Sequence, residues 1–229
     1  GTFTEMAAEK QFGQSVDRLP CGTIDEVFRR TEAGAANYAV VPVENSSGGA
    51  VGRTLDLLPA TPLRICGEVV LRVRQHLMAK MPNPLHTFAR VYSHPQSFSQ
   101  CNGWLNQNLP RADRVEAASN AEAARRAAGE ADACALGPEI VAARYGLQVL
   151  AANVEDDARN MTRFLVLGPN RVGPTGRDRT SLVMSAHNRP GAVHELITPF
   201  ARNGVSMSRI ESRPARTGQW EYLFFVDVD

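Results

Sequence analysis

Up to about residue 168, short apolar runs alternate with segments whose apolar residues recur at the spacing of an amphipathic helix. The apolar runs predict strands at residues 38–43, 65–73, 90–93, 133–135, 148–150 and 163–167. Three helix starts carry a Ser or Thr followed three residues later by Glu, at Thr2 and Glu5, Thr23 and Glu26, and Ser119 and Glu122. Strands that alternate with helices in this way predict an α/β fold with a mainly parallel sheet.

The pattern changes at residues 169–179, where prolines, glycines and charges without an apolar period predict a linker. Beyond it, the spacing predicts a strand at residues 180–186, a helical face at 193–200, and strands at 206–212 and 221–229. This β-α-β-β order matches the first four elements of a ferredoxin-like unit. Because a complete unit needs another helix and strand, we expect this module to be incomplete at its C-terminus and the chain to be part of a longer protein.

Composition narrows the possible functions. The 229 residues contain 25 Lys and Arg against 24 Asp and Glu, a formal net charge of +1, so we expect no nucleic-acid partner. No apolar run approaches the roughly 20 residues of a spanning helix, so we expect no membrane partner. The cysteines stand singly and the histidines lack the spacing of zinc ligands. We therefore expect reduced thiols, a cytoplasmic protein and no metal.

A polar, glycine-rich segment follows the predicted strand at 38–43 directly and begins with Glu44, Asn45 and Ser46. Polar residues at the carboxyl end of a strand, beside a glycine-rich turn into a helix, lie where open α/β sheets bind ligands. The backbone amides of such a turn and the N-terminus of the following helix favour an anion such as a carboxylate. A polar turn that only caps a helix is the alternative, and it stays open.

A second polar cluster, Asn160, Thr162 and Arg163, lies at the start of the predicted strand at 163–167. The planar guanidinium of Arg163 suits a carboxylate. The Thr162 hydroxyl offers both a donor and an acceptor and can polarise a leaving hydroxyl group. A surface ion pair between Arg163 and an acid is the alternative interpretation.

Eight short motifs occur in an order and spacing that together resemble one family. They are GTFTE at residues 1–5, VPVENS at 41–46, TLDLL at 54–58, ICGEV at 65–69, YSHPQ at 92–96, NMTRF at 160–164, NRPGAV at 188–193 and ESRP at 211–214. On these residues, nearly the whole chain resembles prephenate dehydratase followed by an ACT regulatory domain. It looks closest to the proteobacterial two-function proteins in which a chorismate mutase precedes the dehydratase.

The resemblance implies a catalytic region at residues 1–168 with two lobes, similar to periplasmic binding proteins, and an active site in the cleft between them. Lobe 1 would comprise about residues 1–74 and 158–168, and lobe 2 about residues 75–157. The linker at 169–179 would lead to an ACT domain at 180–229 with an α+β ferredoxin-like fold.

The activity that the resemblance implies is that of a lyase. Prephenate would be converted to phenylpyruvate, water and carbon dioxide on the route to phenylalanine, without a metal or organic cofactor. Two alternatives stay open: arogenate, the amino-acid analogue, as the substrate, and a non-catalytic amino-acid sensor with the same architecture.

Carried over residue by residue, the resemblance implies one set of site residues. The catalytic residues would be Thr162, Arg163 and Asn160, and the substrate would be bound by Glu44, Asn45, Ser46, Phe164, Thr2, Thr4 and Ser119. Threonine holds its own proton too tightly to be an acid of matched pKa. We therefore expect Thr162 to donate a hydrogen bond, or to relay a proton, to the leaving hydroxyl. Arg163 and the helix-start amides near residues 46–49 are expected to bind the substrate carboxylates.

For the last domain, the resemblance implies feedback inhibition by L-phenylalanine bound at an interface of a homodimer or tetramer. The residues implied are Asn188, Pro190, Gly191, Ala192 and Val193 in one turn, and Glu211, Ser212, Arg213 and Pro214 at the facing edge. As a charge pattern alone, Glu211 and Arg213 on one face of a strand are typical of a solvated edge.

Overall fold

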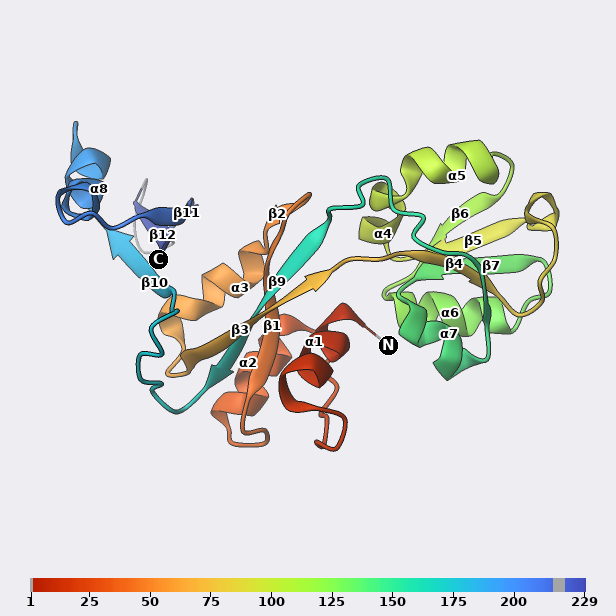
Figure 1. Ribbon diagram of the computed structural model, residues 1–229, viewed down its shortest axis with the longest axis horizontal. Coiled ribbons are helices and arrows are strands. Elements are labelled where there is room, and N and C mark those ends of the chain that lie inside the picture. The colour runs from red at the N-terminus through yellow and green to blue at the C-terminus, as the bar shows by residue number, and fades with distance from the viewer. Residues whose placement is uncertain (1, 216–220) are drawn as a thin grey trace.

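The structure is a computed structural model in which residues 2–215 and 221–229 are described. Gly1, the first residue of the GTFTE motif, therefore lies outside the described residues. Figure 1 shows three units, each built around its own sheet of four, five or three strands. In the described part of the chain, no helix combines the length and apolar character needed to cross a membrane.

The first unit, lobe 1, is an antiparallel sheet in the order β2-β1-β9-β3. Its elements are α1 (Phe3–Phe12), α2 (Ile24–Glu32), β1 (Ala39–Asn45), β2 (Gly49–Ala50), α3 (Gly52–Leu57), η1 (Leu58–Ala60), β3 (Arg64–Arg72) and β9 (Met161–Gly168). The prediction of a mainly parallel sheet is wrong here. β1 and β3 do run in the same direction, but β9 lies between them and is antiparallel to both. The sequence pattern misses this because β9 enters the sheet only after the chain has completed the second unit.

The three predicted helix caps are confirmed. The hydroxyl oxygens of Thr2, Thr23 and Ser119 accept hydrogen bonds from the third amide of their helices at 3.1, 3.2 and 3.1 Å. Each such cap is worth about 1 kcal/mol. The signal is readable in the sequence because both partners lie within one turn of chain.

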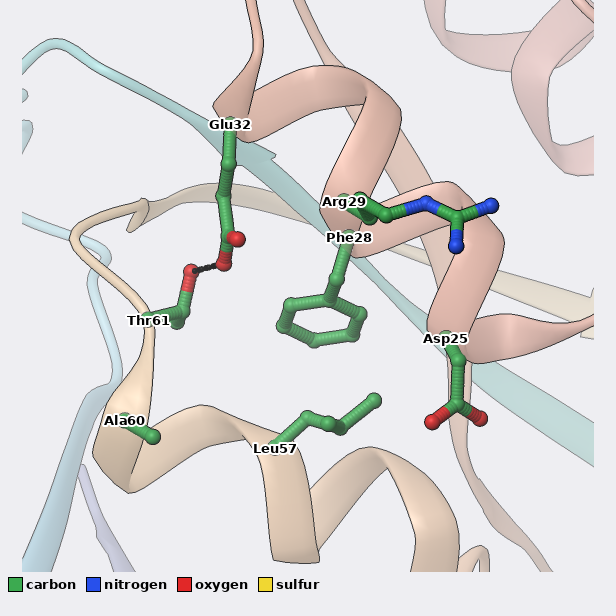
Figure 2. A pocket seen from close by; sticks show the side chains of 7 residues that line it. All are labelled: Asp25, Phe28, Arg29, Glu32, Leu57, Ala60 and Thr61. Carbon is green, nitrogen blue, oxygen red and sulfur yellow. Dashed lines mark hydrogen bonds between the residues drawn. The ribbon is translucent and has the colours of Figure 1, made fainter.

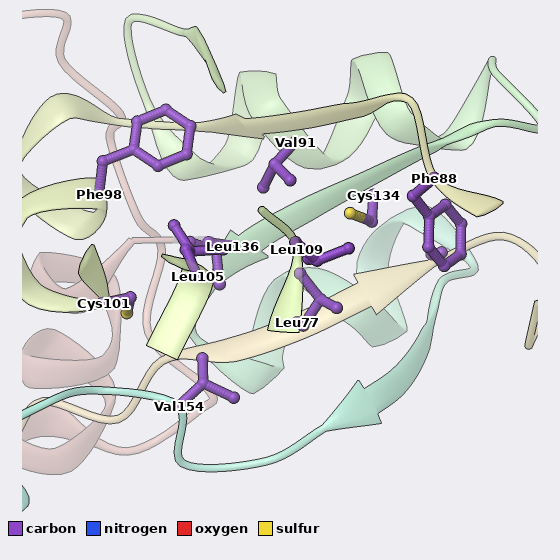
Figure 3. Packing of buried hydrophobic residues seen from close by; sticks show 11 residues of the cluster. Leu77, Phe88, Val91, Phe98, Cys101, Leu105, Leu109, Cys134, Leu136 and Val154 are labelled. Atoms are coloured by element: carbon purple, nitrogen blue, oxygen red, sulfur yellow. The ribbon is translucent and has the colours of Figure 1, made fainter. Parts of the chain in front are cut away.

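The second unit, lobe 2, is a mixed sheet in the order β6-β5-β7-β4-β8. Its elements are β4 (His76–Ala79), η2 (Leu85–Thr87), β5 (Arg90–Ser93), α4 (Pro95–Gln100), α5 (Asn102–Asn108), β6 (Asp113–Glu116), α6 (Asn120–Ala128), β7 (Ala133–Gly137), α7 (Glu139–Tyr145) and β8 (Gln148–Ala151). β5 pairs in parallel with β6 and β7, as the alternation predicts, whereas β4 is antiparallel to β7 and β8. Apolar clusters cover both faces, and Figure 3 shows the one that buries Leu77, Leu105 and Leu136 completely.

The chain passes between the lobes twice, from β3 to β4 and from β8 to β9, and the two crossing segments lie side by side. The amide of Val73 donates to the carbonyl of Asn160 at 2.8 Å, and the amide of Val154 donates to the carbonyl of Gln75 at 2.9 Å. Two short, mutually hydrogen-bonded segments are the geometry of a hinge between rigid bodies.

The third unit is the sheet β10-β12-β11 with one helix. Its elements are β10 (Thr180–Ser185), α8 (Ala192–Arg202), β11 (Met207–Pro214) and β12 (Tyr222–Val228), so the predicted β-α-β-β order is confirmed. One face of this sheet packs on lobe 1. Phe225 of β12 is only 4% exposed and belongs to the same apolar cluster as Val41 of β1 and Leu165 of β9.

The cysteines make no disulfide. All four are free, and burial raises the pKa of the Cys101 and Cys134 thiols to about 12. These two side chains therefore behave as small apolar core residues and stay protonated at neutral pH.

Candidate active site

A bulge in β1 decides which side chains meet in the site. β1 contains one extra residue, Val43, relative to β9. Because side chains alternate along a strand, this bulge exchanges the faces of the residues that follow it. Glu44 is thereby placed opposite Arg163, and Asn45 opposite Thr162 on the other face. Without the bulge, Asn45 would point into the apolar cluster that contains Val43.

Asn45 is the centre of a buried, uncharged hydrogen-bond cluster. Its amide nitrogen donates to Asn160 Oδ1 at 2.8 Å, to Thr162 Oγ1 at 2.9 Å and to the carbonyl of Met161 at 3.2 Å. Asn45, Asn160 and Thr162 are each less than a tenth exposed. Because Thr162 Oγ1 accepts from the amide, the proton of its hydroxyl is directed away from Asn45 and can be donated to a bound molecule.

The turn that follows Asn45 is tied to the same strand start. Asn45 Oδ1 accepts hydrogen bonds from the amides of Ser47 (3.1 Å) and Gly48 (2.8 Å). The amide of Ser46 donates to the Met161 carbonyl, and Ser46 Oγ accepts from the Met161 amide at 2.9 Å. Of the amides that the sequence predicts as a carboxylate site, those of Ser47 and Gly48 are therefore used inside the turn, and that of Ser46 is used by β9. The Ser46 hydroxyl is left with its proton to donate.

Lobe 2 approaches this turn through the YSHPQ motif. A Cβ on Gly48 would lie 3.3 Å from Asn45 Oδ1 and 3.7 Å from Gln96 Nε2, so the side chain of Gln96 reaches across from α4. A side chain at position 48 would press on Asn45 Oδ1, whereas its contact with Gln96 would be an ordinary van der Waals contact. The site lies where the two lobes meet.

Behind Gln96, lobe 2 presents a polar cluster that the sequence analysis did not select. Gln75 donates from Nε2 to Ser97 Oγ at 3.1 Å, and Ser97 in turn donates to Asn120 Oδ1 at 3.2 Å. Gln75 Oε1 and His76 Nδ1 are buried without a hydrogen-bond partner among the described residues. The available signal was a pair of polar residues, Gln75 and His76, directly before a short apolar strand that was not predicted.

His76 is adapted to remain neutral. Burial lowers its pKa, and the nearby Glu139 and Glu155 carboxylates only partly oppose this effect. A neutral imidazole can accept or donate a hydrogen bond without adding charge to the interior of lobe 2.

A hollow of about 660 Å³ lies between α1 of lobe 1 and α7 of lobe 2. It is lined by Met6, Glu9, Lys10, Gln14, Leu71, Glu139, Ile140 and Ala143. Leu71 is paired with Thr162 across β3 and β9, so the two side chains lie on the same face of the sheet and next to each other. The hollow therefore adjoins the Asn45–Thr162 cluster.

A second hollow, of about 350 Å³, lies between α2 and α3 (Figure 2). Phe28, which lines it, belongs to the apolar cluster on the opposite face of the lobe 1 sheet from Thr162. None of the predicted site residues lines it. Its position therefore separates it from the candidate active site.

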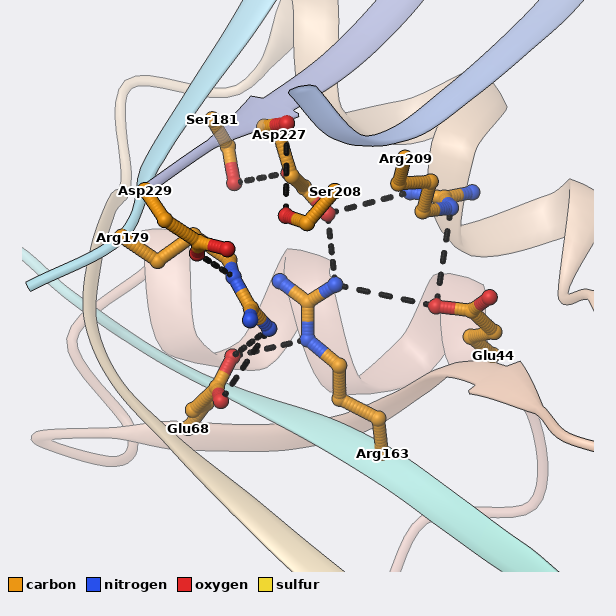
Figure 4. A network of polar contacts seen from close by, with 9 residues as sticks. All are labelled: Glu44, Glu68, Arg163, Arg179, Ser181, Ser208, Arg209, Asp227 and Asp229. Atoms are coloured by element: carbon orange, nitrogen blue, oxygen red, sulfur yellow. Dashed lines mark hydrogen bonds and ion pairs between the residues drawn. The ribbon is translucent and has the colours of Figure 1, made fainter. Parts of the chain in front are cut away.

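Arg163 and Glu44 do not join the Thr162 cluster. Arg163 points to the other face of β9, where Nε lies 2.7 Å from Glu68 and Nη1 lies 2.5 Å from Asp227 of β12 (Figure 4). Glu44 lies 3.7 Å from Arg163 and 3.6 Å from Arg209 of β11. The expectation that Arg163 binds a substrate carboxylate is not supported by this placement, because neighbouring residues of a strand face opposite ways.

The Arg163–Asp227 pair at the centre of this charged network is largely withdrawn from water, whereas Glu44 and Glu68 are each more than a third exposed. Burial alone would raise the pKa of Asp227, but hydrogen bonds from Arg163 and Ser181 hold it below its usual value. Burial would likewise lower the pKa of Arg163, but Asp227 and Glu68 raise it. Both groups are therefore charged at neutral pH, and each depends on the other to be so.

The remaining predicted substrate residues take other positions. Phe164 is 1% exposed and packs beneath the site against Ala7 of α1. The hydroxyls of Thr2 and Ser119 cap their own helices, and Thr4 is half-buried in the first turn of α1. The structure does not bring these residues into hydrogen-bond contact with Thr162, and their contact with a substrate stays a prediction.

The predicted phenylalanine-binding segments lie in the third unit. The turn from Asn188 to Val193 is exposed for most of its length, and Gly191 adopts a left-handed φ of 81° at the start of α8. At the facing edge, Arg213 does not extend into solvent, because its Nε lies 2.7 Å from Asp56 of α3. The interpretation of Glu211 and Arg213 as a solvated edge is therefore wrong for Arg213.

Two family profiles match the chain, one after the other. The sequence profile of the prephenate dehydratase family matches residues 1–172, and that of the ACT domain matches residues 180–229. A bifunctional chorismate mutase/prephenate dehydratase from Stutzerimonas stutzeri is 48% identical over 227 residues, which cover 99% of this chain and 62% of that protein. The chain thus spans about three fifths of the length of this relative.

Two solved structures are similar over the whole chain. The structure of prephenate dehydratase in complex with L-Phe from Arthrobacter aurescens has a TM-score of 0.91 and 35% identity, and 78% of it is covered. A protein described as a novel type of quorum quenching acylase has a TM-score of 0.86 and 28% identity, and 84% of it is covered. The two-lobed α/β fold with a following ACT domain is confirmed. On the profile match, the chain belongs to the prephenate dehydratase family, with an ACT domain after its dehydratase region.

Proposed function

We propose that the chain catalyses the decarboxylative dehydration of prephenate to phenylpyruvate. The observation that carries the proposal is the direction of one hydrogen bond. Asn45 donates to Thr162 Oγ1, so the hydroxyl proton of Thr162 is presented to the cleft beside the hollow between the lobes. Family membership supplies the substrate class, and the geometry supplies a neutral donor for the leaving group.

The proposed reaction requires no covalent bond between the protein and the substrate. The bond between the ring and its carboxylate breaks, and its electrons form the new ring double bond as carbon dioxide leaves. The ring hydroxyl departs with the electrons of its carbon–oxygen bond and takes up a proton to become water. Aromatisation drives the reaction, so the enzyme has to orient the substrate and stabilise charge on the departing oxygen.

Thr162 serves this last requirement. A hydrogen bond from its hydroxyl stabilises negative charge as it develops on the leaving oxygen, and a proton taken from solvent can be relayed through it. Asn45 holds Thr162 in place from the buried side and is itself held by Asn160, and these two asparagines are 4% and 1% exposed. Preorganised donors of this kind are worth about 10²–10³ in kcat.

The substrate carboxylates require donors other than Arg163. The groups that remain beside Thr162 are the Ser46 hydroxyl, the Gln96 side-chain amide from lobe 2, and Lys10, which lines the neighbouring hollow. Two of these belong to lobe 1 and one to lobe 2. Substrate binding would therefore draw the lobes together around the crossing segments.

The acylase neighbour raises hydrolysis of an acyl group as a second candidate activity. Such chemistry needs an activated nucleophile, usually a hydroxyl that donates to a nearby base. In the described residues, Thr162 Oγ1 is hydrogen-bonded to the Asn45 amide, which is a donor and not a base. This geometry favours the dehydratase.

The third unit supports regulation by an amino acid. We propose that L-phenylalanine binds at the turn from Asn188 to Val193, in a cytoplasmic homodimer or tetramer, and lowers turnover. The support is the ACT domain match and the related structure from Arthrobacter aurescens, which is a complex with L-Phe. Inhibition would then reflect tighter binding of phenylalanine to a less active arrangement of the same assembly.

The test is phenylpyruvate formation from prephenate by the purified protein, with and without phenylalanine. Turnover that phenylalanine suppresses is the expected result. A lower kcat/KM on arogenate than on prephenate is also expected, and the reverse order would make arogenate the substrate. A folded protein without turnover on either would instead indicate an amino-acid sensor.

A further inference from the structure

The candidate active site has a charged counterpart directly behind it. In the pairing of β1 with β9, Asn45 lies opposite Thr162 and Glu44 lies opposite Arg163. Since successive side chains of a strand point to opposite faces, Glu44 and Arg163 occupy the back of the same two-strand segment. A shift of the rear pair therefore moves the backbone that carries Asn45 and Thr162.

The rear pair is held by the ACT domain (Figure 4). Arg163 Nη1 lies 2.5 Å from Asp227 Oδ2, and Arg209 lies 3.6 Å from Glu44 and 3.7 Å from the same Asp227 carboxylate. Only 11% of the Arg163 side chain and 4% of the Asp227 side chain are exposed. Separating these two buried charges would cost considerable free energy, because each would be left buried without its partner.

A second contact extends the same interface to α3, the helix that follows β2. Arg213 of β11 pairs with Asp56 of α3 at 2.7 Å and lies over Gly52, the first residue of that helix. A Cβ on Gly52 would lie 2.6 Å from Arg213 Nη1, so the guanidinium occupies the place of a side chain. The ACT sheet thus contacts both β1 and the helix that follows it.

We propose that Glu44 and Arg163 are positioning residues through which the ACT domain sets the placement of Asn45 and Thr162, and with it the rate of turnover. This inference rests on the proposed dehydratase function. Neither side chain touches the substrate in this arrangement, since both lie on the face away from the cleft. A rotated ACT sheet would carry Asp227 and Arg209 with it, and the two strands would have to follow or leave buried charges unpaired.

The experiment compares kcat and KM for prephenate in Glu44→Gln, Arg209→Gln and the double variant, with Arg202→Gln as the control. Arg202 is an exposed residue in the last turn of α8, so its loss removes the same charge from the same domain away from the network. We expect each network variant to lower kcat about tenfold with KM within about twofold of the wild type. The double variant should be no slower than the worse single variant, because the two side chains act through one contact.

The results that would overturn the inference are distinct from failure of the proposed function. An unchanged kcat in both folded single variants overturns it, as does a raised KM for Glu44→Gln at full kcat, which would make Glu44 a substrate ligand. If Arg209→Gln does not fold, Glu44→Gln still decides, because that side chain is 38% exposed and glutamine keeps its shape. No turnover in the wild type contradicts the dehydratase function itself, and the inference falls with it.

Discussion

The two faces of the β1–β9 segment differ in chemistry although they are built from adjacent residues. The cleft face carries Asn45, Asn160 and Thr162, which are neutral and joined by hydrogen bonds of 2.8 and 2.9 Å. The rear face carries Glu44 and Arg163, which form ion pairs with Arg209 and Asp227 of the ACT domain. The ion pairs that anchor the ACT domain therefore lie on one face, and the polar residues of the candidate active site lie on the other. On the proposed function, the cleft face would offer a substrate with two carboxylates a donor without a fixed negative charge, while the charged groups on the rear face hold the domains together.

The largest effect is expected at the cleft face. Thr162→Val keeps the shape of the side chain and removes its hydroxyl, so kcat should fall by about 10²–10³. The measurement is phenylpyruvate formation, with Thr162→Ser, which keeps the hydroxyl, as the matched control. If the valine variant turned over prephenate at the wild-type rate, the assignment of Thr162 would be wrong.

The direction of the Asn45 hydrogen bond can be reversed by one substitution. Asn45→Asp replaces the donor that faces Thr162 with a carboxylate oxygen, so the Thr162 hydroxyl would donate backwards to the strand and not to the substrate. We expect kcat to fall by about 10²-fold, somewhat less than on loss of the hydroxyl. Steady-state kinetics at several pH values check this, because protonating the new carboxyl at low pH should restore part of the lost activity. A pH-independent loss would contradict this explanation.

On the rear face, we expect Asp227 to make the free energy of unfolding depend on pH. Its pKa is depressed in the folded protein, so its stabilisation is present above the unfolded pKa of about 3.9 and is lost as pH falls through the lower folded value. Asp227→Asn should therefore lower the free energy of unfolding by about 1–3 kcal/mol at pH 7. The difference from the wild type should shrink as the pH falls through the depressed pKa of Asp227 in the folded protein. Urea unfolding across this range measures both, and a difference that is constant with pH would contradict it.

The smallest effect is expected at Gly52. Gly52→Ala places a methyl group where Arg213 lies, and the flexible guanidinium can move aside at the expense of its pairing with Asp56. Because this pair is partly exposed, we expect the unfolding free energy to change by less than about 1 kcal/mol. The half-maximal concentration of phenylalanine should change more than kcat does. Gly173→Ala, at a linker position with open space, is the control.

Local signals made much of the architecture predictable. The capping hydroxyls, the β-α-β-β order of the last unit and the positions of most strands follow from interactions within a few residues, and the structure confirms them. The alternation of a strand was also available for Thr162 and Arg163. Applied there, it predicts that the two neighbours cannot both face a substrate.

Other features could not be predicted from neighbouring residues in the sequence. Asp227 stands alone in the apolar run of β12, a pattern typical of a buried charge, but its partner Arg163 lies in another domain. From the sequence, the backbone amides of Ser47 and Gly48 are predicted to be free to bind an anion. In the structure they donate hydrogen bonds to Asn45 Oδ1. In both cases the partner is chosen by folding and not by neighbouring sequence.

The amino-acid sequence alone was sufficient to indicate the family and the kinds of element, because caps, periodicity and motifs are local. Tertiary structure decided that β9 enters between β1 and β3, and that the bulge at Val43 turns Asn45 toward Thr162. It also decided that Arg163 faces the ACT domain. These outcomes depend on which distant strands pair and in which register, and a one-residue difference in register reverses the face of every side chain that follows.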